Sequence, residues 1–152
     1  MISAWFTIAL RAANAPPVTG KFRSACLRTR NSRIGLSEKE ARAKGTPYRL
    51  FKVPMEAVLR ARTLSETRGF LKALVATDSD SILGFAALAP DVGEIMSAVQ
   101  IAMIAGLPYT ALRDGLFAHP TLVEGLIPLF SAKASQSAGA DANVGIAKRA
   151  SQ

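Results

Sequence analysis

The sequence predicts an α+β fold with a small antiparallel sheet, and three local patterns carry that prediction. Two apolar runs in residues 68–90 flank the polar stretch Asp78-Ser79-Asp80, as the strands of a hairpin flank their turn. Residues 91–106 repeat apolar side chains with the period of a helix. A short helix and a strand come before the hairpin, and two helical segments come after residue 106. This order of elements is typical of an α+β domain.

The first two predicted elements are a short helix and a strand. Ser37 is the expected N-cap of the helix, Glu40 stands at the capping-box position, and Gly45 ends it. Residues 48–55 alternate in side-chain character as a strand does and then meet Pro54. Because proline cannot donate a backbone hydrogen bond to a neighbouring strand, we expect this strand to end there, near an edge of the sheet.

The hairpin and the helix after it have clear boundaries. Gly69 and Gly84 stand in the two hairpin strands, and we expect them where the packing leaves no room for a side chain. Asp91 and Glu94 have capping-box spacing at the start of helix 91–106. Gly106, with a proline two residues later, ends that helix.

Helix 91–106 is apolar on both sides. The side chains that follow the i, i+3, i+4, i+7 rule are Val92, Ile95, Met96, Val99, Ala102 and Met103. Ala98, Ile101 and Ala105 make the opposite side apolar as well, and a helix of this kind is covered on both sides. We favour a second chain as the cover of the outer side; the alternative is the N-terminal segment. The residues expected to be uncovered in a monomer are Ile101, Met103 and Ile104, so we predict a homodimer or poor solubility.

The only histidine of the chain lies between the predicted helical segments 110–115 and 120–130. Pro120 suits the first turn of the second segment. Glu124 then falls just over one turn along, so its carboxylate can approach the imidazole of His119. Such a carboxylate fixes the tautomer through one ring nitrogen and leaves the other nitrogen to exchange protons. The alternative is that His119 caps the helix while Glu124 is solvated, and spacing alone favours this simpler interpretation.

The stretch AHPTLVEGL around His119 resembles the His-Pro-Thr-x-x-Glu signature of the pyridine nucleotide-disulfide oxidoreductases. Residues 34–131 resemble the C-terminal dimerisation domain of that family in element order, and VPMEAVLRARTLSETRGF is most similar to the mercuric-reductase-like branch, next to dihydrolipoamide dehydrogenases. The resemblance implies that helices pack on one face of the sheet. It also implies pairing about a twofold axis, as a homodimer or with a fuller oxidoreductase chain, through residues 91–106 and 119–130.

The same resemblance implies roles for three residues. His119 would be the catalytic acid–base for a thiol in the partner subunit, Glu124 would orient its imidazole, and Pro120 would follow a cis peptide bond near the partner's flavin. Mercury handling is not expected, because the C-terminal cysteine pair of mercuric reductases is absent from residues 132–152.

Several parts that the family needs are missing from this sequence. It contains no Gly-x-Gly-x-x-Gly turn for a dinucleotide, and Cys26, its single cysteine, cannot supply the family's C-x4-C pair or a metal site. We therefore expect no FAD or NAD(P)H bound by this chain alone and no activity alone. The predicted function is an isolated dimerisation domain, a truncated remnant of a flavin-dependent disulfide oxidoreductase. Two alternatives stay open, a subunit of a split oxidoreductase and a small basic binding protein.

The charge of the chain sits at its ends. Of the net +8, residues 1–33 contribute six basic and no acidic residues, residues 34–131 are balanced at ten of each, and residues 132–152 carry three basic and one acidic residue. The N-terminal segment lacks the interleaved aromatic and basic residues of strand binders, so nucleic-acid binding is not expected. With 49% hydrophobic residues but no apolar run of about 18, the chain is typical of a globular protein outside the membrane.

Residues 1–33 do not resemble the family. Plausible codons for this segment, read one nucleotide earlier, give family-like sequence, so we hypothesise a frameshift near Ser32 or Arg33. Residues 132–152 are small and polar, and we predict that they are disordered. The lone thiol fits a reducing compartment, and the expected location is the cytoplasm.

Overall fold

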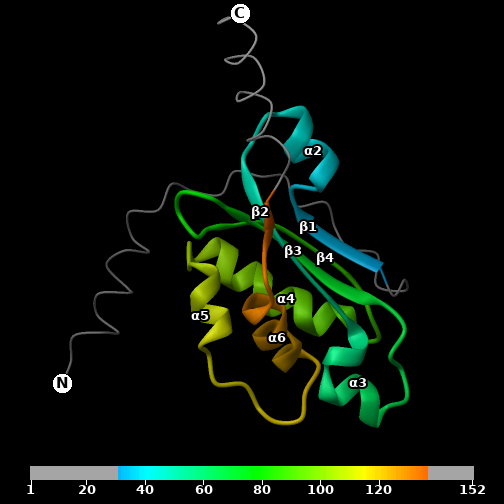
Figure 1. Ribbon diagram of the computed structural model, residues 1–152. Helices are drawn as coiled ribbons and strands as arrows, with labels where there is room; N and C mark the ends of the chain where they lie inside the picture. Colours follow the sequence, from blue (N-terminus) through cyan, green and yellow to red (C-terminus); the bar gives the residue numbers. More distant parts are fainter. Residues whose placement is uncertain (1–30, 137–152) are drawn as a thin grey trace, which may run out of the picture.

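An antiparallel sheet forms the centre of the computed structural model, which describes residues 31–136 (Figure 1). Its strands are β1 (Asn31–Gly35), β2 (Tyr48–Pro54), β3 (Phe70–Ala76), β4 (Ile82–Leu88) and β5 (Ser135–Gln136), in the order β1-β4-β3-β2-β5. The helices are α2 (Glu38–Ala43), α3 (Leu59–Thr63), α4 (Val92–Ile104), α5 (Tyr109–Arg113) and α6 (Leu126–Ser131), with 3-10 turns η1 (Met55–Ala57) and η2 (Val123–Gly125). The predicted α+β fold with an antiparallel sheet is confirmed.

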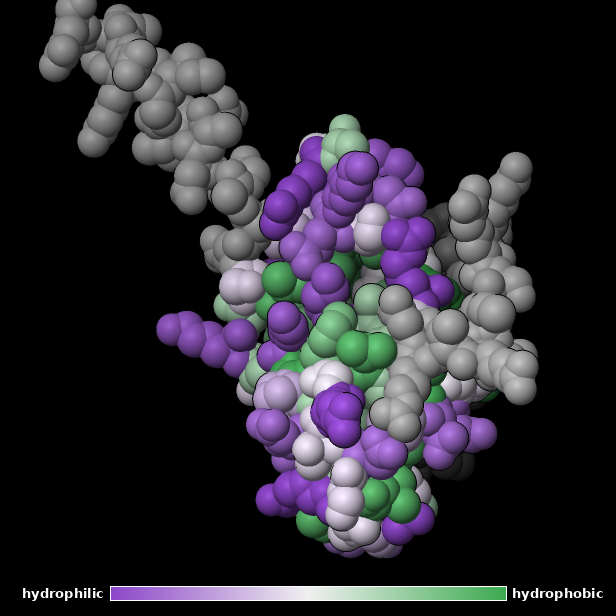
Figure 2. Space-filling view, turned by 90° about the vertical axis from the view of Figure 1, so that its right-hand side faces the viewer, coloured by the Kyte–Doolittle hydropathy of each residue, from purple (hydrophilic) through white to green (hydrophobic). Residues whose placement is uncertain are grey.

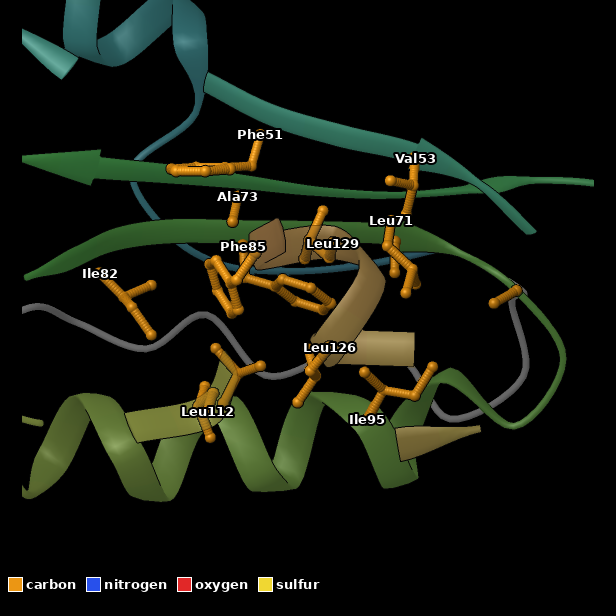
Figure 3. Close-up of a cluster of buried hydrophobic side chains, with 14 of the residues drawn as sticks. Phe51, Val53, Leu71, Ala73, Ile82, Phe85, Ile95, Leu112, Leu126 and Leu129 are labelled. Atoms are coloured by element: carbon orange, nitrogen blue, oxygen red, sulfur yellow. The ribbon is translucent and has the colours of Figure 1, made fainter. Parts of the chain in front are cut away.

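The main core lies between the sheet and the helices α4, α5 and α6, which cover one face of it (Figure 1). Alternate residues of the strands point into this layer, and Figure 3 shows them meeting side chains of the helices. Three rings from different elements pack together at its centre, since the centroid of Phe51 lies 5.2 Å from that of Tyr109 and 5.8 Å from that of Phe130. Burial of this apolar surface is the main force that holds the helices on the sheet.

The predicted hairpin is confirmed as β3 and β4. They pair from Phe70 with Leu88 to Val75 with Ile82, with one irregularity at Leu74 and Val75. Strand β2 ends at Pro54 as predicted and has only the two-residue β5 on its outer side. Gly84 lies directly beneath the link between β1 and α2, where an added Cβ would stand 2.0 Å from a backbone carbonyl oxygen.

Helix α2 packs on the other face of the sheet, and its predicted N-terminus is confirmed. The Glu40 amide donates to the Ser37 hydroxyl, and the Glu40 carboxylate accepts from the Ser37 amide at 2.8 Å, which is the predicted capping box. Glu38 forms an ion pair with Lys72 of β3 at 2.8 Å and another with Arg42 at 3.1 Å. Hydrophilic residues therefore gather around α2, at the top of the surface in Figure 2.

Replacing Glu38 with glutamine should lower the free energy of unfolding by about 1 kcal/mol at neutral pH. The hydrogen bond from Lys72 holds the pKa of Glu38 below its ordinary value of 4.5. A lowered folded-state pKa stabilises the fold above pH 4.5, and this stabilisation is lost as the pH falls through the folded-state pKa. Urea unfolding of both proteins at pH 7 and pH 3 measures the difference. An equal gap at the two pH values would contradict the assigned cause.

Most of the sequence prediction for helix α4 is confirmed, and two details of it are wrong. Asp91 has a left-handed φ of +43° and its side chain caps nothing, so the predicted capping box with Glu94 is wrong. The turn is closed by backbone instead, because the Glu94 amide donates to the Asp91 carbonyl. Met103 was expected on the outer side but is buried, since it faces β1 beside Gly35. Gly106, with a φ of +64°, ends the helix region as predicted.

The helix predicted over residues 120–130 begins later. Residues 120–122 are not helical, η2 follows, and α6 starts at Leu126. The Thr121 hydroxyl donates to the Ala118 carbonyl at 2.8 Å and accepts from the Glu124 amide at 3.4 Å. These bonds fold the segment into a turn, so the first α-helical turn can form only after it.

The sheet includes residues before and after the range 34–131, which the sequence predicted as the domain. Asn31 to Arg33 belong to β1, and Ser135–Gln136 form β5. The predictions for the basic N-terminal segment and for tail disorder concern residues 1–33 and 132–152, of which residues 1–30 and 137–152 lie outside the described part. Within residues 31–136, no helix has the length and apolar character needed to cross a membrane.

Candidate functional site

His119 and Glu124 meet at the end of the loop that joins α5 to η2. The distance from His119 Nδ1 to Glu124 Oε1 is 2.7 Å. The peptide bond between His119 and Pro120 is cis, as the resemblance implied. The approach of the carboxylate to the imidazole, which spacing alone did not favour, is therefore present in the structure.

Packing beneath Glu124 fixes its position. Gly125, the next residue, is buried where an added Cβ would stand 2.8 Å from Val58 and 3.0 Å from Leu71. Because there is no side chain at this position, η2 can lie directly on β3 and the residues that follow η1. A larger residue would lift η2 and move the carboxylate of Glu124 away from the imidazole. Neither Gly125 nor Thr121 carries a local sequence signal for its role in this site, although the Thr121 hydroxyl closes the turn before Glu124.

The two side chains differ in exposure in a way that suits proton exchange with another molecule. The imidazole of His119 is 62% exposed, while the side chain of Glu124 is 26% exposed. One carboxylate oxygen, Glu124 Oε2, is buried and has no hydrogen-bond partner within the described residues. With Nδ1 held by the carboxylate, Nε2 is the nitrogen available to a reacting group.

A groove of about 600 Å³ adjoins the loop that carries the pair. It lies between α3, the start of α4 and the residues from Pro120 to Val123. Apolar side chains such as Leu64 and Leu122 line it, together with the guanidinium of Arg60 and the carboxylates of Asp91 and Glu94. In the described ranges, no three His, Cys, Asp or Glu side chains gather as a metal site would require.

Comparison with known proteins decides what this fold and loop belong to. The profile described as pyridine nucleotide-disulphide oxidoreductase, dimerisation domain, matches residues 27–128, which is more than half of the chain. The chain belongs to this family. The match begins before residue 34, in agreement with the extent of β1, so the sheet and the family profile both begin before the boundary inferred from sequence.

The relatives that match are much longer proteins. The chain is 42% identical over 100 residues to a probable pyridine nucleotide-disulfide oxidoreductase, RclA, of Escherichia coli, covering 66% of this chain and 23% of that protein. It is 34% identical over 91 residues to the dihydrolipoamide dehydrogenase of Chaetomium thermophilum, covering 60% of this chain and 18% of the relative. The solved structure of the HOCl-induced flavoprotein disulfide reductase RclA matches with a TM-score of 0.64 over 66% of this chain.

The chain thus spans about a quarter or less of the length of these relatives. What is shared is the dimerisation domain.

Proposed function

We propose that this chain is a dimerisation domain without activity of its own, whose His119–Glu124 pair completes a disulfide or dithiol site carried by another oxidoreductase chain. The observation that supports this most directly is the 2.7 Å contact between an exposed imidazole and a largely buried carboxylate. A histidine with a purely structural role would be expected to make its contacts inward. Here the ring is held at one nitrogen and presented outward at the other.

The proposed chemistry is proton transfer to and from sulfur. When a cysteine thiol of the other chain becomes a thiolate, His119 accepts its proton at Nε2, and it returns the proton when the thiolate leaves. Glu124 keeps the ring oriented and stabilises the imidazolium that forms. The flavin held by the other chain would supply the electrons that reduce the disulfide. Nothing in this role requires a nucleotide site on the present chain.

Residues 1–33 enter the proposal only through the frameshift hypothesis. If the hypothesis is correct, the gene's nucleotide sequence, read with a one-base shift upstream of residue 33, encodes family-like sequence. If no one-base shift does so, the segment has another origin. Neither result changes what His119 is proposed to do.

A complementation experiment tests the proposal. A full-length relative such as Escherichia coli RclA, with its own corresponding histidine replaced by alanine, is mixed with this chain under conditions that allow subunit exchange. Nicotinamide-dependent disulfide reduction should rise at least about tenfold with the wild-type chain. It should not rise with His119→Ala, because that variant cannot take up the thiol proton. The activity regained should also show a pH profile that shifts in Glu124→Gln.

The His119→Ala chain is the matched control for assembly. The His119 side chain is mostly exposed, so its removal should not disturb assembly. Sedimentation should show that the variant chain binds the relative as well as the wild-type chain does. Equal rescue by both chains would contradict the role of His119. Failure of the wild-type chain to join or rescue would contradict action in trans. Disulfide reduction by the purified chain alone, or flavin co-purifying with it, would show that it carries its own cofactor site.

A further inference from the structure

The large apolar side chains left exposed in the described residues fall mainly in three places. They are Leu64 at 39%, Leu88 at 37%, Ile101 at 66%, Ile104 at 61% and Leu116 at 102% exposure. Ile101 and Ile104 lie on the outer side of α4, Leu64 lines the groove beside Pro120, and Leu116 lies in the loop after α5. Leu116 is fully exposed, so nothing in the described residues covers its apolar surface, and burying it against a partner would be favourable.

The surrounding residues present Leu116 outward. Phe117 packs against the main core, and its ring lies 3.5 Å from the place that a Cβ of Gly115 would take. Further along, the Thr121 hydroxyl binds the Ala118 carbonyl. The loop is thus anchored at the residue after Leu116 and again close to His119.

The groove and Leu116 belong to opposite ends of α4. Asp91 and Glu94, at the N-terminal end of the helix, line the groove. The C-terminal end leads through residues 105–108 into α5, and Leu116 follows it. In Figure 1 the loop from α5 to η2 then runs back beneath α4 towards its N-terminal end, where residues 120–123 line the groove.

Pairing through α4 alone would make too small an interface. The helix has 13 residues and is therefore about 20 Å long. A specific dimer buries roughly 800 Å² of each partner, several times what one helix of this length can cover. The contact must continue past both ends of α4, where Leu116 and the groove stand.

Twofold symmetry joins these two features. Two copies of α4 can pack antiparallel, related by a twofold axis that lies in the plane of contact and is perpendicular to both helices. The C-terminal end of each helix then lies over the N-terminal end of the other. The loops of both copies then stay on the same side of the helix pair. Gly93 leaves open space around the N-terminal end, with no atom within 4 Å of a hypothetical Cβ, so the bulky end of the second helix can approach.

We propose that Leu116 of each copy seats in the groove lined by Leu64 of the other copy, so that two such contacts flank the α4 pair. The occupant of the groove is thus a second copy of this chain. This contact rests on the proposed role of the chain as a dimerisation domain and adds the residues that extend the interface beyond α4. The loop that carries His119 is thereby held against the partner at Leu116.

Cysteine cross-linking of the full chain tests the contact. In a Cys26→Ser background, Leu64→Cys together with Leu116→Cys should give a covalent dimer under mild oxidation, seen on a non-reducing gel. The matched control combines Leu116→Cys with Lys44→Cys, an exposed position at the end of α2 on the other face of the sheet, and should stay monomeric on the gel. In the uncross-linked chain, Leu116→Ser should raise the dimer dissociation constant at least tenfold in sedimentation, since two leucines lose their burial.

The outcomes separate this inference from the proposed function. A chain that sediments as a dimer but gives no Leu64–Leu116 cross-link between copies overturns the Leu116 contact alone. A disulfide formed within one copy overturns it as well. A chain that sediments as a monomer at micromolar concentration overturns pairing through α4, and the Leu116 contact with it.

Discussion

Replacing Gly69 with alanine should lower the free energy of unfolding by more than about 4 kcal/mol, or prevent folding. Gly69 has a φ of +127°, a conformation that side chains rarely allow. A Cβ at this position would stand 1.8 Å from the Leu88 carbonyl oxygen, which belongs to the neighbouring strand β4. Gly69 cannot move away from this oxygen, because the amide of Met55 donates to the Gly69 carbonyl and ties the residue to η1. Urea unfolding followed by circular dichroism measures the loss.

Gly45→Ala is the matched control for this experiment. Gly45 also has a positive φ, +62°, but no atom lies within 4 Å of the Cβ that alanine would add. The substitution therefore costs only the backbone strain, about 1–2 kcal/mol. Equal losses in the two variants would show that the contact with Leu88 does not decide the stability at position 69.

The second large effect is expected at Ile101 on the outer side of α4. Ile101→Asp should weaken self-association at least about a hundredfold, because a carboxylate would lose its hydration on pairing without gaining a partner. The monomer should fold normally, since this side chain is 66% exposed in the described structure. Sedimentation over a range of concentrations measures the dissociation constant, and thermal unfolding at low concentration checks the fold.

Ala43→Asp is the control for added charge alone. Ala43 is exposed at the end of α2, on the opposite face of the sheet from α4, and this variant should associate as the unmodified chain does. Unchanged association of Ile101→Asp would place the contact between chains on some other surface.

In the proposed function, the His119 loop acts on a second chain, and the apolar outer side of α4 is the surface that would hold that chain. Residues 34–131 carry ten basic and ten acidic residues, so the basic excess of the chain lies outside the range that holds α4 and the His119 loop.

Local sequence rules predicted the elements whose determinants are local. The capping box of Ser37 and Glu40 forms because both partners lie within one turn of α2. The hairpin follows from two apolar runs around a polar turn, and the stop at Gly106 follows from a residue that accepts a positive φ. The spacing of Asp91 and Glu94 was equally suitable, yet the capping box did not form. The chain turns out of β4 with Asp91 in the left-handed region, and its side chain does not reach the helix amides.

The candidate site likewise combines features that the sequence predicted with features that only the tertiary structure determines. The sequence placed His119, Pro120 and Glu124 together through spacing and family resemblance, and it predicted the class of fold from hydrophobic period. Only the tertiary structure decided that the carboxylate contacts Nδ1, because that distance depends on Gly125 lying on β3 and on Thr121 closing the turn. Only the tertiary structure placed Met103 inside and left Ile101, Ile104 and Leu116 outside. Periodicity tells which side chains share a face of a helix, but what covers that face depends on strands that are distant in the sequence.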